Sequence, residues 1–217
     1  AALSRAHLRG ASLFNIDLQG ADLFKADLSG ANMNHGLLAN ANLLGSVLDG
    51  AKMERVKWGE CLVQEQNGMA AEADGRHEEA RRCYDEAQEI YRTLRQAYDR
   101  VGRFDEAGHF FQREMAMKRR LLSRWSPARF WSKLAELYCG YGESPPKVII
   151  AALIVIFMSG LLFFLIGVKG PGGPVQLAPH LGLEQNLLML GDCVYYSVIT
   201  FTTTGYGDII PLGTSRA

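Results

Sequence analysis

The sequence has few features that would indicate an enzyme or a disulfide-bonded protein. Its four cysteines are scattered along 217 residues without a CxxC pair and without the His/Cys spacing of a zinc site. No metal-ligand cluster, phosphate-binding loop or nucleophile elbow occurs, so we expect neither a cofactor nor enzymatic activity. Lys and Arg balance Asp and Glu at 23 each, so net charge by itself points to no class of partner.

The chain also lacks an initiator methionine and a signal peptide, and it opens inside a repeat. We therefore expect a fragment that is cut at its N-terminus and at its C-terminus.

Residues 1–58 instead repeat an apolar side chain at every fifth position. A helix turns about 100° per residue, so a five-residue step gives no apolar stripe, and a flat strand would expose every second leucine. The period is satisfied if each repeat turns the chain by a fixed angle, so that the apolar residue and the small residue two positions earlier point inward every time. The apolar positions are Leu3, Leu8, Leu13, Leu18, Leu23, Leu28, Met33, Leu38, Leu43, Leu48, Met53 and Trp58.

The segment "ADLFKADLSGAN" at 21–32 closely matches the pattern A(D/N)Lxx, and this region resembles the pentapeptide-repeat family. The resemblance implies a right-handed quadrilateral β-helix with four repeats per coil, about three coils in all. Some family members mimic DNA with an acidic surface, but residues 1–58 hold five acids and six Lys/Arg. We therefore expect a rigid scaffold or docking surface, with Trp58 placed to close its lower end.

Residues 59–125 predict helical hairpins. "GRHEEARRCYDEA" (75–87) and "GRFDEAGHFFQRE" (102–114) are similar at an offset of 27, and each Gly-Arg predicts a turn followed by acids at a helix start. The pattern resembles tetratricopeptide-type hairpins, although their usual period is about 34. We expect one buried stripe of Tyr91, Leu94, Tyr98 and Val101, and another of Phe104, Ala107, Phe111, Met115 and Leu122.

Residues 113–133 are basic, with a single acid, Glu114. Trp125, Phe130 and Trp131 lie among the basic residues, and Ser126-Pro127 is a helix-start signal. We predict an interfacial amphipathic helix and linker over 126–146 that contacts the lipid bilayer, because an apolar segment follows. A nucleic-acid patch is the alternative, and we expect no nucleic-acid partner. The basic residues are Arg113, Lys118, Arg119, Arg120, Arg124, Arg129 and Lys133.

Residues 148–168, "VIIAALIVIFMSGLLFFLIGV", contain no charge and predict a membrane-spanning outer helix. At about 1.5 Å per residue the helix spans roughly 31 Å, which matches a hydrocarbon core of about 30 Å. Because the basic cluster precedes the span, the positive-inside rule places residues 1–147 in the cytoplasm and the Gly/Pro-rich loop 169–186 outside. We expect a protein of the cell membrane, from a prokaryote.

The segment 187–201, "LLMLGDCVYYSVITF", is too short to cross, so we expect a re-entrant helix. Irregular backbone at membrane depth is tolerated only where protein or a water-filled cavity covers it, so "TTTGYGD" (202–208) must line something. Glycine allows backbone conformations that align successive carbonyls, and such carbonyls replace the water around a potassium ion.

The hexapeptide Thr203-Thr204-Gly205-Tyr206-Gly207-Asp208 resembles the TxGYG signature of the potassium-channel pore-loop family, which Asp usually follows. The resemblance covers 147–217 and implies a homotetramer in which each subunit gives one loop. It also implies that the carbonyls of residues 203–206, with the Thr203 hydroxyl, bind K⁺ as the permeant ion. Gly207 and Asp208 would support this selectivity filter.

Two departures from the family pattern lie in the expected pore helix 187–201. Tyr195 and Tyr196 stand where paired tryptophans are common, and we expect both to pack around the filter and donate hydrogen bonds. Ile199 stands where some bacterial members place a buried Glu, so Asp208 lacks that partner. We expect inactivation that does not depend on a carboxyl pair.

The family pore also needs an inner helix after the filter, and this chain ends nine residues past Asp208. We expect the full sequence to continue with about 20 apolar residues. No apolar helix carries Arg at every third position, so no voltage sensor is expected, and gating would come from the domains before the span.

The sequence therefore favours a potassium-selective channel subunit whose cytoplasmic repeat and helical domains regulate it or act as a scaffold. The alternative is a membrane-tethered scaffold with a pore region that does not conduct. A less selective cation channel is a third hypothesis, which the intact GYG disfavours. We expect a protein partner, if one binds, at the repeat or helical region.

Overall fold

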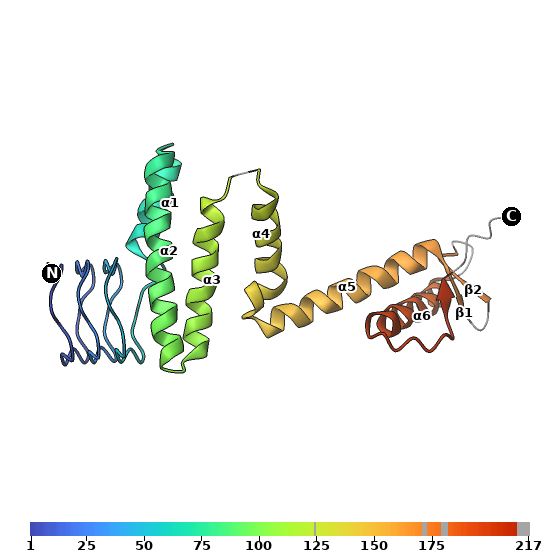
Figure 1. Cartoon of the computed structure of the whole chain (residues 1–217). Coiled ribbons are helices and arrows are strands. Elements are labelled where there is room, and N and C mark those ends of the chain that lie inside the picture. The colour runs from blue at the N-terminus through green and yellow to red at the C-terminus, as the bar shows by residue number, and fades with distance from the viewer. Residues whose placement is uncertain (124, 171–172, 179–181, 212–217) are drawn as a thin grey trace. The chain divides into compact units, whose positions relative to one another are not determined.

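The computed structural model describes residues 1–123, 125–170, 173–178 and 182–211 (Figure 1). The chain divides into two compact units, Ala1–Glu143 and Ser144–Ala217, and each has its own hydrophobic core. Arg124 of the basic segment and parts of the loop 169–186 lie outside the described residues.

Residues 1–57 wind into stacked coils at the N-terminal end of the chain (Figure 1, blue). Parallel bridges join residues that are 20 apart in sequence, from Ala2↔Asp22 to Leu37↔Lys57. Leu3 N donates to Asp22 O over 2.8 Å, and Asp22 N donates to Ala1 O over 2.9 Å. Since 20 residues are four repeats of five, each coil consumes four repeats.

The corners between successive repeats explain the residue at the fifth position. At each corner a backbone hydrogen bond closes a tight turn, as from Ala6 N to Leu3 O over 3.1 Å. The fifth residue has a positive φ at every corner from residue 5 to residue 55, and glycine and asparagine reach that region at the lowest cost. The corner residues with positive φ are Arg5, Gly10, Asn15, Gly20, Lys25, Gly30, His35, Asn40, Gly45, Gly50 and Arg55.

The interior of the coils holds the side chains that the five-residue period places there. Leu23, Leu28 and Met33 are fully buried, as are Ala26 and Ala31. Leu3, Leu8 and Leu13 of the first coil are only partly buried, because no second layer covers its outer side in the described part of the chain. The inward direction of the apolar and small residues was therefore predicted correctly.

Four α-helices follow within the first unit: α1 (Val63–Ala73), α2 (His77–Arg100), α3 (Phe104–Leu121) and α4 (Pro127–Cys139). A short 3₁₀ helix, η1 (Gly140–Gly142), comes after α4. Helix α2 packs on both α1 and α3. The predicted Gly-Arg turns occur between these helices, because Gly75 and Gly102 have φ of 75° and 76°, a region that glycine adopts readily.

Both predicted apolar stripes are partly wrong. Val101 and Phe104 are exposed, because they lie at the turn between α2 and α3 rather than on the packed face. Phe110 is buried in place of Phe111, since α3 turns the face of Ala107 toward α2. The sequence period identified the helices but not the rotation of α3 about its axis.

Trp58 lies where the coils meet the helices. Its indole nitrogen Nε1 donates to Tyr98 Oη over 3.0 Å, and Tyr98 Oη donates to Met53 O over 3.0 Å. The Trp58 ring also packs edge-on against Phe110, with 5.9 Å between ring centroids. The end of the coil is therefore covered by Trp58 together with aromatic side chains of α2 and α3.

The second unit contains α5 (Pro145–Ile166), α6 (Leu183–Phe201) and three short strands, β1 (Val168–Gly170), β2 (Gly173–Val175) and β3 (Ile210–Pro211). The strands form one antiparallel sheet in the order β2-β1-β3. Among the described residues, α5 is the one helix long and apolar enough to cross a membrane, judged by length and composition.

Helices α5 and α6 pack closely where a glycine meets a valine. A Cβ added to Gly160 would lie 2.9 Å from Val194 Cγ2, so glycine is needed for this approach. One turn earlier along α5, Ser197 Oγ donates to Ile156 O over 2.7 Å. These contacts hold the C-terminal half of α6 against the apolar helix α5.

Both helices of this unit begin earlier than predicted. The outer helix was expected at 148–168 and is found at 145–166, because prolines are accepted in the first helical turn and Gly167, with φ of 96°, ends the helix. The pore helix was expected at 187–201, whereas α6 begins at Leu183. Three of the four added residues are polar, namely Glu184, Gln185 and Asn186, so a boundary set by hydrophobicity does not detect them.

Candidate functional site

The stretch 202–208 leaves the end of α6 through a defined turn. Thr203 N donates to Thr200 O over 3.1 Å, and Thr204 N donates to Ile199 O over 3.0 Å. This pair of bonds is a Schellman motif, in which the residue after the C-cap adopts a left-handed conformation. That residue is Thr203, with φ of 58°.

Threonine is an unusual residue for a left-handed turn. Its branched Cβ costs about 1–2 kcal/mol there, a cost that glycine would avoid. Such strained positions cluster at functional sites, where the surrounding structure holds them. The presence of Thr203 therefore points to a role for its side chain beyond ending the helix.

Two glycines continue this backbone pattern. Gly205 and Gly207 have φ of 52° and 76°, whereas Thr204 and Tyr206 between them do not have a positive φ. A Cβ at either glycine would meet nothing within 4 Å. Backbone conformation, rather than lack of space, is therefore the reason for glycine at both positions.

Side-chain hydrogen bonds fix both ends of the stretch. Tyr195 Oη donates to Asp208 Oδ2 over 3.0 Å, which ties the end of the loop back to α6. At the beginning, Thr202 Oγ1 donates to Val198 O over 2.9 Å and lies 2.8 Å from Thr204 Oγ1.

The other residues singled out from the sequence take separate positions. Tyr196 faces α5, where its ring packs edge-on against Phe163 at 4.9 Å between centroids. Ile199 is buried, and Tyr206 is exposed in the single chain. The two neighbouring tyrosines thus differ, because Tyr195 contacts the loop and Tyr196 contacts the apolar helix.

The stretch is rich in neutral oxygen atoms and poor in charged ligands. Asp208 is its single acid. Within the described residues no group of three or more His, Cys, Asp or Glu side chains is placed to hold a metal ion. The carbonyls at the C-terminal end of α6 add partial negative charge nearby. The arrangement therefore suits a weakly held cation that binds backbone and hydroxyl oxygens.

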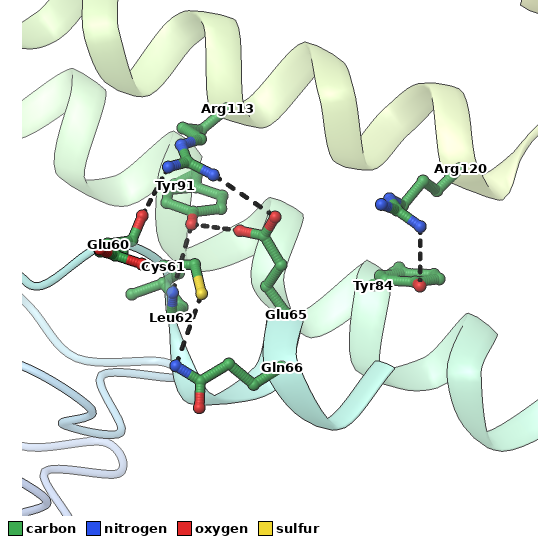
Figure 2. A network of polar contacts seen from close by, with 9 residues as sticks. All are labelled: Glu60, Cys61, Leu62, Glu65, Gln66, Tyr84, Tyr91, Arg113 and Arg120. Carbon is green, nitrogen blue, oxygen red and sulfur yellow. Dashed lines mark hydrogen bonds and ion pairs between the residues drawn. The ribbon is translucent and has the colours of Figure 1, made fainter. Parts of the chain in front are cut away.

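The basic segment 113–133 is less positive than its sequence indicated. Three of its arginines form ion pairs with acids that lie 17 to 48 residues away in sequence. Folding therefore neutralises part of the positive charge of this segment. The pairs are Arg113–Glu65 at 3.5 Å, Arg119–Glu136 at 2.6 Å and Arg120–Glu72 at 3.0 Å, and Figure 2 shows Arg113 beside Glu65.

Glu114, the single acid of that segment, is buried between two arginines of α2. Its Oε1 accepts from Arg92 Nε over 3.0 Å, and its Oε2 accepts from Arg95 Nε over 2.9 Å. The sequence contains no signal for this cluster, since the residues lie on different helices. It joins α2 to α3 through charge-assisted hydrogen bonds.

Comparison with known families gives matches in two separate parts of the chain. Residues 1–38 and 26–57 match the family of pentapeptide repeats, in eight copies. Residues 152–217, which include most of α5, all of α6 and the stretch 202–208, match the family described as ion channel. The chain thus matches the pentapeptide repeats over residues 1–57 and the ion-channel family over residues 152–217.

The pentapeptide-repeat region has a relative among solved structures. It is similar to a pentapeptide repeat protein (Rfr23) from the cyanobacterium Cyanothece 51142, with 34% identity and a TM-score of 0.28. The match covers 29% of this chain and 42% of that protein, so this chain spans less than half of its length. No curated protein matches the chain.

Proposed function

We propose that the protein is a subunit of a potassium-selective channel whose ion sites are the carbonyl oxygens of Thr203, Thr204, Gly205 and Tyr206, with the Thr203 hydroxyl. The observation that carries this proposal is the alternating sign of φ over 203–207 directly after α6. In a strand, successive carbonyls point to opposite sides, and alternating the sign of φ removes that reversal. The carbonyls can then line one path for a dehydrated K⁺.

The supporting residues fit this role. The hydrogen bond from Tyr195 to Asp208 braces the outer end of the loop, and Gly207 allows the chain to turn there. The exposed Tyr206 ring leaves an apolar surface that a neighbouring subunit would cover in a homotetramer. With Ile199 in place of a carboxylic acid, inactivation would not depend on a carboxyl pair.

The proposal also assigns a fold and a location to the domains that precede the pore region. Residues 1–58 form a right-handed quadrilateral β-helix, which the spacing of bridges by 20 residues supports. Residues 59–125 form hairpins of the tetratricopeptide type, supported by the packing of α2 against α1 and α3. Both would lie in the cytoplasm with the rest of 1–147, where they regulate the pore or dock a protein partner, while the loop 169–186 lies outside.

Residues 126–146 would contact the inner surface of the membrane, and the exposed face of α4 supports this. Its polar side faces α3, where Glu136 pairs with Arg119 at 2.6 Å. Its apolar side faces outward, opposite to the usual arrangement in a soluble helical domain. Phe130, Trp131 and Leu137 are 63%, 64% and 71% exposed. Aromatic and apolar side chains on one face are typical of a helix at the membrane interface.

Potassium flux into liposomes, measured with the protein expressed from its complete gene, tests the channel proposal. We expect K⁺ flux that exceeds Na⁺ flux and that Gly205→Ala abolishes, because alanine at φ of 52° is strained. Gly191→Ala is the matched control, since Gly191 lies within α6 and a Cβ there meets nothing within 4 Å.

Equal K⁺ and Na⁺ flux would contradict selectivity, and flux that survives Gly205→Ala would contradict the proposed ion path. A correctly assembled protein without flux would favour the membrane-tethered scaffold.

A further inference from the structure

The first unit contains a cavity of about 470 Å³ that the channel proposal does not use. It is lined by side chains of α1, α2, α3 and α4, among them His77, Arg81, Arg120 and Arg129. Its volume lies within the range of about 300–1,000 Å³ typical of small-molecule sites. Basic side chains from three helices therefore meet at one hollow.

One side of the cavity is a closed polar group of three residues. Tyr84 Oη donates to Glu72 Oε2 over 2.7 Å, and Arg120 Nη1 donates to the same carboxylate oxygen over 3.0 Å. The Arg120 guanidinium also lies over the Tyr84 ring, 5.1 Å from its centroid (Figure 2). The Tyr84 hydroxyl and then Arg120 and Arg129 lower the pKa of Glu72. The Glu72 carboxylate is therefore held in its ionised form and paired with Arg120.

The other basic residues of the cavity form no ion pair with a carboxylate in the part of the chain that the structure describes. Among the described residues Arg81 forms no hydrogen bond or ion pair, and Arg129 donates to a neutral group, the carbonyl oxygen of Leu122, over 3.3 Å. His77 adds an imidazole to the same wall. Glu78 is the one lining acid outside the Glu72 group. Three arginines and His77 thus line the cavity against two acids, Glu72 and Glu78, which leaves an excess of basic groups.

We propose that this cavity binds a small phosphate monoester, with Arg81 and Arg129 holding the phosphate oxygens. Guanidinium forks match phosphate geometry and form two parallel hydrogen bonds each. The remaining volume accommodates the organic part of the ligand beside His77 and Tyr84. Since Arg81 lies on α2 and Arg129 on α4, the bound phosphate ties α4 to α2. This site is independent of ion conduction.

Calorimetric titration of the detergent-solubilised whole protein with adenosine monophosphate tests the site, with inorganic phosphate as the minimal probe. Arg81→Ala and Arg129→Ala should each weaken binding about tenfold or more, because each removes charge-assisted hydrogen bonds. Arg82→Ala is the matched control, since it removes the same charge from the same helix outside the cavity lining. Glu78→Gln should tighten binding, because it removes the unpaired acid.

Arg81→Ala should fold normally, since its side chain is exposed and without a partner among the described residues. Hydrogen exchange gives a second measurement, in which the ligand should slow exchange in the first turns of α4. A phosphate monoester could also come from a lipid headgroup, so vesicles containing phosphatidylinositol 4-phosphate form a second arm. Binding in that arm that requires Arg81 and Arg129 would support the same site and identify a lipid source.

Three outcomes would overturn the proposal. The first is the absence of binding to adenosine monophosphate, inorganic phosphate and the vesicles alike. The second is equal weakening by Arg81→Ala and Arg82→Ala, which would indicate general attraction by a basic surface. The third is a ligand affinity that neither Glu78→Gln nor Arg129→Ala changes. Because these measurements do not involve flux, a failed channel proposal would leave them interpretable.

Discussion

Replacing Gly68 by alanine tests how tightly α1 packs on α2. Gly68 lies in the middle of α1, and by helix propensity alone alanine would stabilise this position by about 1 kcal/mol. The structure predicts instead that alanine at this position lowers the free energy of unfolding. A Cβ at Gly68 would lie 2.7 Å from Tyr84 Cε1 and 2.8 Å from Tyr84 Cδ1, well inside the contact distance of about 3.5–4.0 Å.

The Tyr84 ring has little freedom to move away from such a methyl group. The residue is 3% exposed, and its hydroxyl is bonded to Glu72 and Arg120. Overpacking of this kind costs about 1–3 kcal/mol, and a displaced ring also weakens hydrogen bonds worth about 1 kcal/mol each. After the gain in propensity is subtracted, we expect net destabilisation of about 1–2 kcal/mol.

Gly108→Ala is the matched control on α3. There a new Cβ would meet the end of the Glu143 side chain, which is exposed and flexible and can turn away. The propensity gain should remain, so we expect stabilisation of up to about 1 kcal/mol. The two variants thus carry the same chemical change, and we predict that Gly68→Ala lowers the free energy of unfolding whereas Gly108→Ala raises it.

Native-state hydrogen exchange, followed by mass spectrometry on the whole protein, measures both changes. Exchange in α1 and α2 should become about five- to thirtyfold faster with Gly68→Ala, since about 1.4 kcal/mol corresponds to a factor of ten. Unchanged or slower exchange in that variant would show that Tyr84 can move, and the packing argument would be wrong.

Three further changes test other contacts. Glu114→Gln should destabilise the packing of α2 on α3 by about 2 kcal/mol. The cost is smaller than for a fully buried ion pair, because the two arginines reach water. Unchanged hydrogen exchange in α2 and α3 would contradict this prediction. Tyr195→Phe removes the bond to Asp208 and should shorten the open lifetime of the channel in single-channel recordings, whereas Tyr196→Phe should not. Burial raises the pKa of Tyr98 to about 12, so the free energy of unfolding should fall as pH rises from about 10 to 12. Tyr98→Phe should reduce that fall. The same pH dependence of the unfolding free energy in both proteins would refute the prediction.

Local conformational requirements made much of the chain predictable. The five-residue period located the inward leucines, because each repeat turns the chain by the same amount. Gly75 and Gly102 marked the turns between helices, since both need positive φ. The uncharged run in α5 identified the apolar helix from composition alone. In these segments the deciding interactions lie within a few residues of each other.

Helix rotation was not predictable in the same way. Phe110 and Phe111 are both compatible with a buried face of α3, and only packing against α2 placed Phe110 inside. Tyr195 and Tyr196 present the same problem on α6, where one ring bonds to Asp208 and the other packs on Phe163. A period of 3.6 residues leaves such neighbours nearly equivalent until a second element is placed.

The sequence by itself determined the repeat period, the apolar helix and the glycine pattern of the stretch 202–208, because each depends on the conformation of nearby residues. Tertiary structure alone decided which charges are neutralised and which remain free. Glu114 meets its arginines, and Arg81 and Arg129 meet at one cavity, only after helices distant in sequence pack together. Electrostatic interaction depends on distance in space, and a linear sequence does not contain that distance.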